Sequence, residues 1–428
     1  MGRRERLSRL SRWYGPSRPV FSGGNEAQLL RGGDQLFPLM RARIDAAHEE
    51  VWLATYIFHH DAAGRALLDS LVAAAARGVR VRVVVDGFGS LASLDWLERG
   101  VAGTGIALAE FRPLKKWWSW LEPGQLRRLH QKLCVVDGEY GFIGGVNIID
   151  DRDDLHHGMG EQPRLDFAVA VRGAIVAPIE QAARAVWTRA WLGRDFGEEL
   201  VNLVRGPEPV RRMRNLLRGV RMPRGEPRRG NAQAPALPPV CVGFVLRDNL
   251  RQRRTIESAY VEAIDTAQTS VDLITPYFYP GQTFRRALRD AARRGVRVRL
   301  LLQGKVDYVL AGMAARALYV ELLGYGVQIF EYTEAWLHAK TCVVDGRWAT
   351  VGSSNIDPLS LLLNLEANVI VIDAPFARSL ETEFEIAIAG ARRVERGGGQ
   401  GWRGVLGRAV VAWVAYVYLR VAGATGRY

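Results

Sequence analysis

One octapeptide occurs twice in this chain of 428 residues. Residues 130–137 read HQKLCVVD, and residues 338–345 read HAKTCVVD. In both copies an asparagine follows ten residues after the aspartate, at Asn147 in GGVN and at Asn355 in GSSN. A duplication that keeps His-x-Lys in both copies predicts two similar halves and one reaction that needs two histidines.

The repeat extends to longer stretches of sequence. VWLATYIF at 51–58 matches VDLITPYF at 271–278, and ARGVRVRVVVDG at 76–87 matches RRGVRVRLLLQG at 293–304. Each copy shows an apolar strand, a helical stretch, Arg-Gly and then a Val-rich strand, which is typical of βαβ units. We therefore predict two tandem α/β halves related by a pseudo-twofold axis. Each should be a mostly parallel mixed sheet flanked by helices, and the active site should lie at their interface.

The length accommodates two ordinary domains, and composition suggests where they begin and end. We predict a basic N-terminal segment, a first half, a basic Pro/Gly-rich linker, a second half and a C-terminal amphipathic segment, at residues 1–20, 21–204, 205–239, 240–396 and 397–428. The N-terminus lacks the apolar stretch of a signal peptide, and no run reaches the ~18 apolar residues of a spanning helix.

Three segments admit a structural and a membrane interpretation. The linker is either a solvated tether or a polybasic patch for acidic lipid, and the C-terminal segment is either a packed helix or an interfacial anchor. LKKWWSWLEPG at 114–124 is either core or a lip that meets lipid headgroups, and we favour the lip.

The formal charge of +13 favours an anionic partner such as nucleic acid, an acidic lipid surface or a phosphate-bearing substrate. Only five basic residues are lysine, and two of them, Lys132 and Lys340, fall in the repeated motif. An ammonium at those positions indicates a need for a compact cation.

The three cysteines indicate reduced thiols in a cytosolic setting, and we interpret Cys134 and Cys342 as buried packing residues. His156 and His157 follow an acidic run, which we interpret as a solvated loop rather than a metal site.

Residues two apart on a strand share a face, so His130 should point the same way as Lys132, and His338 the same way as Lys340. The motif aspartates, Asp137 and Asp345, differ in parity from the histidines and precede glycines. We therefore interpret them as structural turn residues, with pairing to a nearby base as the alternative.

Two His-Lys pairs form a cationic pocket that suits a phosphodiester. One imidazole attacks phosphorus while the other protonates the leaving oxygen, and an attacking imidazole needs a carboxylate to fix its tautomer. Asp166 and Glu366, on the strand after each motif, are the candidates. The nonbridging oxygens would be held by Lys132, Lys340, Asn147, Asn355 and Ser353.

H-x-K-x-x-x-x-D twice in one chain, each followed by G-[GS]-x-N, resembles the phospholipase D superfamily over nearly the whole length. Finer detail resembles the bacterial cardiolipin synthases of the B type, which lack N-terminal membrane spans: TVGSSNIDPLSLLLNLEANVIVID, GGNEAQLL, RDNLRQRRTIESAYVEAI and PYFYPG. One departure from symmetry is Gly145, which stands where the second copy has Ser353.

The resemblance implies a transesterification without metal or cofactor. One phosphatidylglycerol would form a phosphatidyl-histidine enzyme, and a second would resolve it to cardiolipin. The catalytic set would be the two motifs, His130, Lys132, Asp137, His338, Lys340 and Asp345. His130 would be the nucleophile and His338 the acid and base, with Asp166 and Glu366 orienting the histidines. The partners would be anionic phospholipids and no nucleic acid, at the cytoplasmic side of the inner membrane.

Three alternatives remain open at this point. Water or another alcohol would make the chain a phospholipase D or a different phosphatidyltransferase. The charge would also suit a metal-independent nuclease of the same superfamily. A scaffold without activity is the third alternative, against which both motifs are intact.

Overall fold

The computed structural model describes residues 19–113, 128–154, 158–205, 240–247, 252, 254–305, 318–357 and 364–395. Five features discussed above lie outside those residues: the N-terminal segment up to residue 18, the 114–124 segment, His156 and His157, the linker after residue 205 and the C-terminal segment. No helix within the described part is both long and apolar enough to cross a membrane.

The first half begins with a long strand and a helix and ends with a second long helix. Its elements are β1 (Val20–Arg31), α2 (Gly32–Asp45), β2 (Glu50–Thr55), α3 (Ala62–Ala76), β3 (Arg80–Asp86), α4 (Leu94–Val101), β4 (Ala107–Phe111), β5 (Leu133–Val136), β6 (Tyr140–Gly144), β9 (Phe167–Arg172) and α5 (Val176–Arg205). A separate two-stranded ribbon joins β7 (Asp153–Asp154) to β8 (Gly158–Met159).

The second half repeats this order. Its elements are β10 (Val240–Arg247), α7 (Thr255–Thr266), β11 (Ser270–Thr275), α8 (Gln282–Arg293), β12 (Arg297–Gln303), β13 (Gln328–Tyr332), β14 (Thr341–Val344), β15 (Trp348–Gly352), β16 (Glu366–Ile372), α11 (Ala374–Ala389) and β17 (Arg392–Arg393). The matching order confirms the predicted duplication into two α/β halves.

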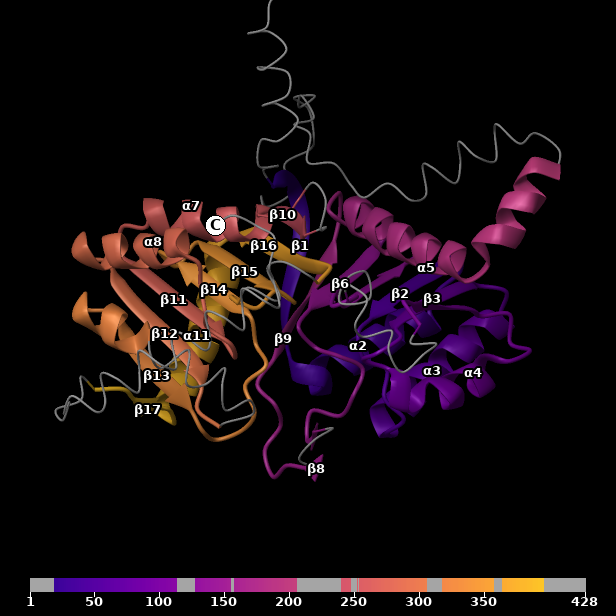
Figure 1. Ribbon diagram of the computed structural model, residues 1–428, viewed down its shortest axis with the longest axis horizontal. Helices are drawn as coiled ribbons and strands as arrows, with labels where there is room; N and C mark the ends of the chain where they lie inside the picture. The colour runs from indigo at the N-terminus through magenta and orange to yellow at the C-terminus, as the bar shows by residue number, and fades with distance from the viewer. Residues whose placement is uncertain are drawn as a thin grey trace, which may run out of the picture.

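The two halves share one continuous sheet. Within the described residues, fifteen strands follow the order β17-β13-β12-β11-β14-β15-β16-β10-β1-β9-β6-β5-β2-β3-β4. The halves join at β1. Its first residues pair antiparallel with β10 of the second half, and its remaining residues pair antiparallel with β9 of the first half. Figure 1 shows this joint between the indigo-to-magenta half and the orange-to-yellow half.

The prediction of a mostly parallel sheet is wrong. Among the strands that the structure describes, parallel ladders join β2, β3 and β4 and join β11, β12 and β13, and the other ladders of the large sheet are antiparallel. The parallel strands follow the helical stretches seen in the sequence. The strands after each motif instead turn back at once, since Asp137-Gly138 and Asp345-Gly346 adopt positive φ and form tight turns.

Among the described residues, three hydrophobic clusters form the core. One holds α2, α3 and the sheet face of the first half, and another holds α7, α8 and the equivalent face of the second. The third contains buried side chains of α5, of α11 and of strands from both halves, including Ile179, Phe167, Val343 and Leu380. This shared cluster packs the two halves into one body under the joint. Cys134 and Cys342 lie buried in the first two clusters, which confirms their packing role.

Candidate active site

Each motif is bound by backbone pairing to the other half, next to that half's buried carboxylate. The His130 amide donates to the Leu365 carbonyl at 3.0 Å, and the His338 amide donates to the Leu165 carbonyl at 2.9 Å. Each histidine thus stands beside the residue that precedes the other half's carboxylate. The ring centroids of His130 and His338 are consequently 6.5 Å apart.

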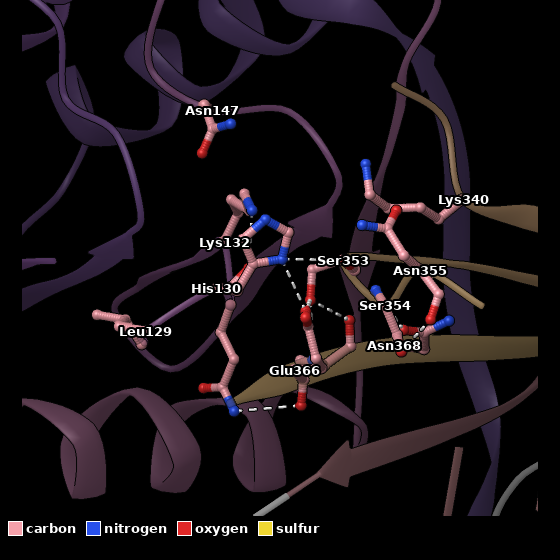
Figure 2. Close-up of polar contacts among 12 residues, drawn as sticks. Leu129, His130, Lys132, Asn147, Lys340, Ser353, Ser354, Asn355, Glu366 and Asn368 are labelled. Atoms are coloured by element: carbon pink, nitrogen blue, oxygen red, sulfur yellow. Dashed lines mark hydrogen bonds and ion pairs between the residues drawn. The ribbon is translucent and has the colours of Figure 1, made fainter. Parts of the chain in front are cut away.

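The carboxylates serve the histidines in a crossed arrangement. His130 Nδ1 lies 2.9 Å from Glu366 Oε2, and His338 Nδ1 lies 2.6 Å from Asp166 Oδ2. Figure 2 shows Glu366, on a strand of the second half, reaching His130 of the first. A carboxylate acceptor fixes the proton on Nδ1, so Nε2 of each ring carries the lone pair. The expected contacts between these carboxylates and histidines are present, with each histidine served by the opposite half.

The two carboxylates have different environments. Ser353 Oγ donates to Glu366 Oε2 at 2.5 Å and accepts from the Ala367 amide at 3.1 Å. At the equivalent place a Cβ on Gly145 would lie 2.2 Å from Asp166 Oδ1, so only glycine leaves room for that carboxylate. The expected contact of the Ser353 hydroxyl with phosphate is at odds with this geometry, because the hydroxyl is buried and bonded to Glu366.

These environments shift the two acids in opposite directions. Burial raises the pKa of Asp166 to about 6, although Lys340 and the Phe167 amide act against the rise. Burial also acts on Glu366, but His130, Lys132 and the Ser353 hydroxyl outweigh it and hold the pKa of Glu366 below its usual value. Glu366 is therefore the more firmly ionised of the two carboxylates.

The lysines fold back on their own histidines. Lys132 Nζ donates to the His130 carbonyl at 2.8 Å, and Lys340 Nζ donates to the His338 carbonyl. Both side chains are buried, and burial lowers the pKa of Lys132 to about 7 and that of Lys340 to about 8. Each lysine thus lies beside its histidine, although both residues come just before β5 or β14 and not within a strand as the parity argument assumed.

Burial also acts on the two imidazoles. It lowers the pKa of His130, with Lys132 and Lys340 adding to the effect and Glu366 opposing it. It lowers the pKa of His338 still further, because Lys340, Lys132 and Arg164 all repel a proton there. Both imidazoles are therefore neutral near neutral pH, which a nucleophilic nitrogen requires.

The motif asparagines lie at the same site with unequal contacts. Asn147 Oδ1 accepts from the Ile57 amide at 3.3 Å. Asn355 Oδ1 is buried and has no hydrogen-bond partner within the described part of the chain. Figure 2 shows Asn355 beside Lys340 and Asn147 on the opposite side of His130 from them.

The motif aspartates, which the resemblance places in the catalytic set, lie at the turns after each motif and accept hydrogen bonds from backbone amides. The Asp137 carboxylate accepts from the amides of residues 48, 49 and 50, each at 2.9 Å. Asp345 does the same for the amides of residues 268–270. Burial acts to raise both pKa values, but these amides outweigh it and lower them. These contacts support the structural interpretation, and the catalytic role of the aspartates stays a prediction.

Two further residues of the site escaped the sequence analysis. The Tyr56 ring centroid lies 5.2 Å from that of His130, and Lys132 Nζ lies 5.5 Å from the Tyr56 ring. Asp86, at the end of β3, is buried and accepts from the Leu129 amide at 2.8 Å, one residue before His130. The sequence contained one signal for these two residues, which is that they differ between the copies: the second copy has Pro276 in place of Tyr56 and Gln303 in place of Asp86.

The described residues contain no group of three His, Cys, Asp or Glu that could hold a metal ion. What they contain is a partly buried pair of imidazoles with two buried ammonium groups beside them. This arrangement suits a tetrahedral anionic centre that is attacked from one side and protonated from the other.

The comparison with protein families agrees with this geometry. The family model described as cardiolipin synthase, PLD-like domain, matches residues 40–156 and 260–387, and each stretch contains one histidine motif. The phosphatidylserine synthase of Haemophilus influenzae Rd KW20 shows the same fold, with a TM-score of 0.62, 13% identity and 98% of both chains covered.

Two similar sequences are cardiolipin synthases by name. Cardiolipin synthase B of Escherichia coli K12 is 37% identical over 366 residues, which cover 86% of this chain and 81% of that protein. A probable cardiolipin synthase of Bacillus subtilis is 29% identical over 360 residues, 84% of this chain and 65% of that protein. The chain belongs to the cardiolipin synthase family of phospholipase D-like proteins.

Proposed function

We propose that this chain is a cardiolipin synthase, which transfers a phosphatidyl group from one phosphatidylglycerol to another and releases glycerol. The observation that carries the proposal is the pair of histidines with ring centroids 6.5 Å apart, each bonded at Nδ1 to a buried carboxylate. The family membership and the named relatives support the substrate class.

In the first step His130 Nε2 attacks the phosphorus of the donor phosphatidylglycerol. The P–N bond forms as the P–O bond to glycerol breaks, and His338 gives a proton to the departing oxygen. Because the bound phosphodiester is anionic, it offsets the two ammonium groups and raises the pKa of His338, which can then carry that proton.

In the second step the terminal hydroxyl of another phosphatidylglycerol attacks the same phosphorus. His338, now neutral, accepts the hydroxyl proton as the new P–O bond forms and the P–N bond breaks. Cardiolipin leaves, and both histidines return to their starting states. Two similar displacements explain why one site needs two histidines that differ in role.

The nucleophile assignment is supported by the asymmetry of the carboxylates. Glu366, held ionised by Ser353 and the site cations, stabilises the positive charge that develops on His130 when it bonds to phosphorus. Asp166, whose burial raises its pKa to about 6, is the weaker anion and serves the histidine that exchanges protons. We propose that both carboxylates orient their histidines and that Ser353 acts through Glu366.

The phosphate oxygens are held by Lys132, Lys340, Asn147 and Asn355. An ammonium has three N–H donors, and the contact with its own histidine carbonyl occupies one of them in each lysine. We also propose that the protein works as a peripheral enzyme on anionic phospholipid at the cytoplasmic side of the inner membrane, where its charge of +13 favours binding.

Purified protein incubated with phosphatidylglycerol tests the proposal. We expect cardiolipin and glycerol in equal amounts, and we expect His130→Ala and His338→Ala each to abolish both products. Added phosphatidylethanolamine or free alcohols would reveal a different acceptor. Phosphatidic acid as the sole product would make the chain a phospholipase D, and metal-free cleavage of DNA that His130→Ala abolishes would make it a nuclease.

A further inference from the structure

A cation and an aromatic ring are paired beside each histidine motif. In the first half the Arg128 guanidinium lies 5.2 Å from the Phe88 ring centroid. In the second half Lys305 Nζ lies 5.8 Å from the Trp336 ring. Arg128 and Trp336 each stand two residues before a motif histidine, and Phe88 and Lys305 each stand two residues after a Val- or Leu-rich strand.

The two pairs occupy equivalent positions in the repeat, but the aromatic residue and the cation have changed places between the halves. The strand that ends at Asp86 is followed by the aromatic residue, whereas its repeat, which ends at Gln303, is followed by the cation. The position before the histidine shows the reverse. Both sides of the site thus present one aromatic ring and one cation, although no residue at these four places is shared between the copies.

The aromatic residue of the first pair is exposed together with a leucine. Phe88 is 55% exposed and Leu91 is 53% exposed, although both lie in a well-bonded turn rather than at a chain end. Lys305 is exposed on the other side of the site. A cation–π contact alone contributes little at an exposed position and does not require an exposed leucine beside it.

The turn that carries Phe88 is bonded to Leu129, the residue just before His130. The Asp86 carboxylate accepts from the amides of Phe88 at 2.9 Å and Gly89 at 3.1 Å, and its other oxygen accepts from the Leu129 amide at 2.8 Å. The Ser90 hydroxyl donates to the Tyr56 carbonyl at 3.0 Å, and the ring of Tyr56 lies against His130. The exposed side chains of Phe88 and Leu91 are therefore held in a fixed position relative to His130.

We propose that these residues form a site rim that docks onto the surface of an anionic phospholipid bilayer. The site rim consists of Phe88, Leu91, Arg128, Lys305 and Trp336. Aromatic side chains and long cations both favour the headgroup zone of a bilayer, where the rings reach toward the acyl chains and the cations meet phosphate. This inference rests on the proposed function, since a phosphodiester in a bilayer lies at that depth.

A bilayer fits these residues better than nucleic acid does. The net charge of +13 suits either partner, but half-exposed phenylalanine and leucine side chains gain free energy only where they leave water. Insertion of Phe88 and Leu91 would bring Lys305, the exposed cation of the site rim, to the phosphates, while Arg128, whose side chain is mostly buried beside Asp86, supports the Phe88 ring. His130, which is held against that turn, and His338 beside it would then face the scissile phosphodiester without removing the lipid from its layer.

Vesicle binding and two forms of substrate test the site rim. The double variant Phe88→Ser/Leu91→Ser should bind phosphatidylglycerol-containing vesicles about tenfold more weakly than the unsubstituted protein. It should turn over vesicular phosphatidylglycerol more slowly. On short-chain phosphatidylglycerol below its critical micelle concentration the rate should be unchanged. Ile386→Ser, which removes a 52% exposed side chain from α11, is the matched control and should behave like the unsubstituted protein.

The cations are tested by Lys305→Gln, which should weaken vesicle binding about fivefold at low salt, with Arg286→Gln on α8 as the exposed control. Unchanged vesicle binding in the double variant would overturn the proposal, as would an equal loss in Ile386→Ser. So would an equal loss of rate on short-chain and vesicular substrate, or tighter binding to duplex DNA than to vesicles. If the unsubstituted protein fails to convert short-chain phosphatidylglycerol, the proposed function fails, while vesicle binding still decides the site rim.

Discussion

The crossed carboxylates predict that Glu366→Gln slows catalysis by a histidine of the other half. Glu366 Oε2 lies 2.9 Å from His130 Nδ1, so the centre of the carboxylate charge lies about 4 Å from the imidazole charge that develops during attack. At an effective dielectric constant of about 20 the pair is worth about 4 kcal/mol, and the glutamine carbonyl recovers about 1 kcal/mol as a neutral acceptor. The remaining loss of about 3 kcal/mol corresponds to about 10²-fold in kcat/KM.

The measurement is the initial rate of glycerol release from short-chain phosphatidylglycerol. Glu331→Gln is the matched control, because Glu331 on β13 is also a buried glutamate with an ionic partner, Arg392 on the edge strand β17. We expect the control to keep its rate. A loss below threefold in Glu366→Gln, or a similar loss in the control, would refute the electrostatic role of the crossed pair.

Three further predictions concern Gly145, Asp137 and the two motif lysines. Gly145→Ala places a Cβ 2.2 Å from Asp166 Oδ1, so we expect a loss of about tenfold or more in kcat, and an unchanged kcat would show that the carboxylate can move. Asp137→Ala should lower the free energy of unfolding by about 2 kcal/mol at neutral pH, because three backbone amides lose their acceptor, while the folded protein keeps its kcat. The depressed pKa of Asp137 gives stability above the unfolded pKa that is lost as pH falls, so the denaturation difference should shrink below about pH 4. Because burial lowers the pKa of Lys132 to about 7 and that of Lys340 to about 8, KM for phosphatidylglycerol should rise from pH 7 to 9, and a flat KM would contradict this.

The sequence predicted the histidines, the lysines and the two carboxylates because each occurs twice. A repeated pattern at constant spacing identifies positions under a shared constraint without any knowledge of the fold. Strand parity likewise separated His130 and Lys132 from Asp137, because side chains alternate across a strand. These features depend on local geometry, which the order of residues determines.

The crossed pairing could not be predicted in this way. Asp166 follows the first motif in sequence, and nothing in its neighbours indicates that it serves His338 rather than His130. That choice depends on the joint between β1 and β10 and on the backbone bonds of Leu165 and Leu365 to the opposite half. Contacts between segments about two hundred residues apart are a property of the assembled sheet.

The sheet directions and the role of Ser353 were missed for related reasons. Val-rich runs suit both parallel and antiparallel strands, so only the Asp-Gly turns, at 137–138 and 345–346, carried the signal for the antiparallel return. Ser353 has the composition of a phosphate ligand, but its hydroxyl donates to Glu366. Whether the Ser353 hydroxyl bonds to substrate phosphate or to the Glu366 carboxylate depends on distances in the folded protein, which the spacing of residues along the sequence does not give.

The joining of both halves in one chain lets the two copies differ. A symmetric dimer of identical subunits would have to give both histidines the same acid and the same neighbour on the preceding strand. Here one acid is a glutamate beside a serine and the other an aspartate beside a glycine. Because both halves are in one chain, the two sides of the site can have different residues. A mutation of a carboxylate in one half changes the environment of the histidine in the other half.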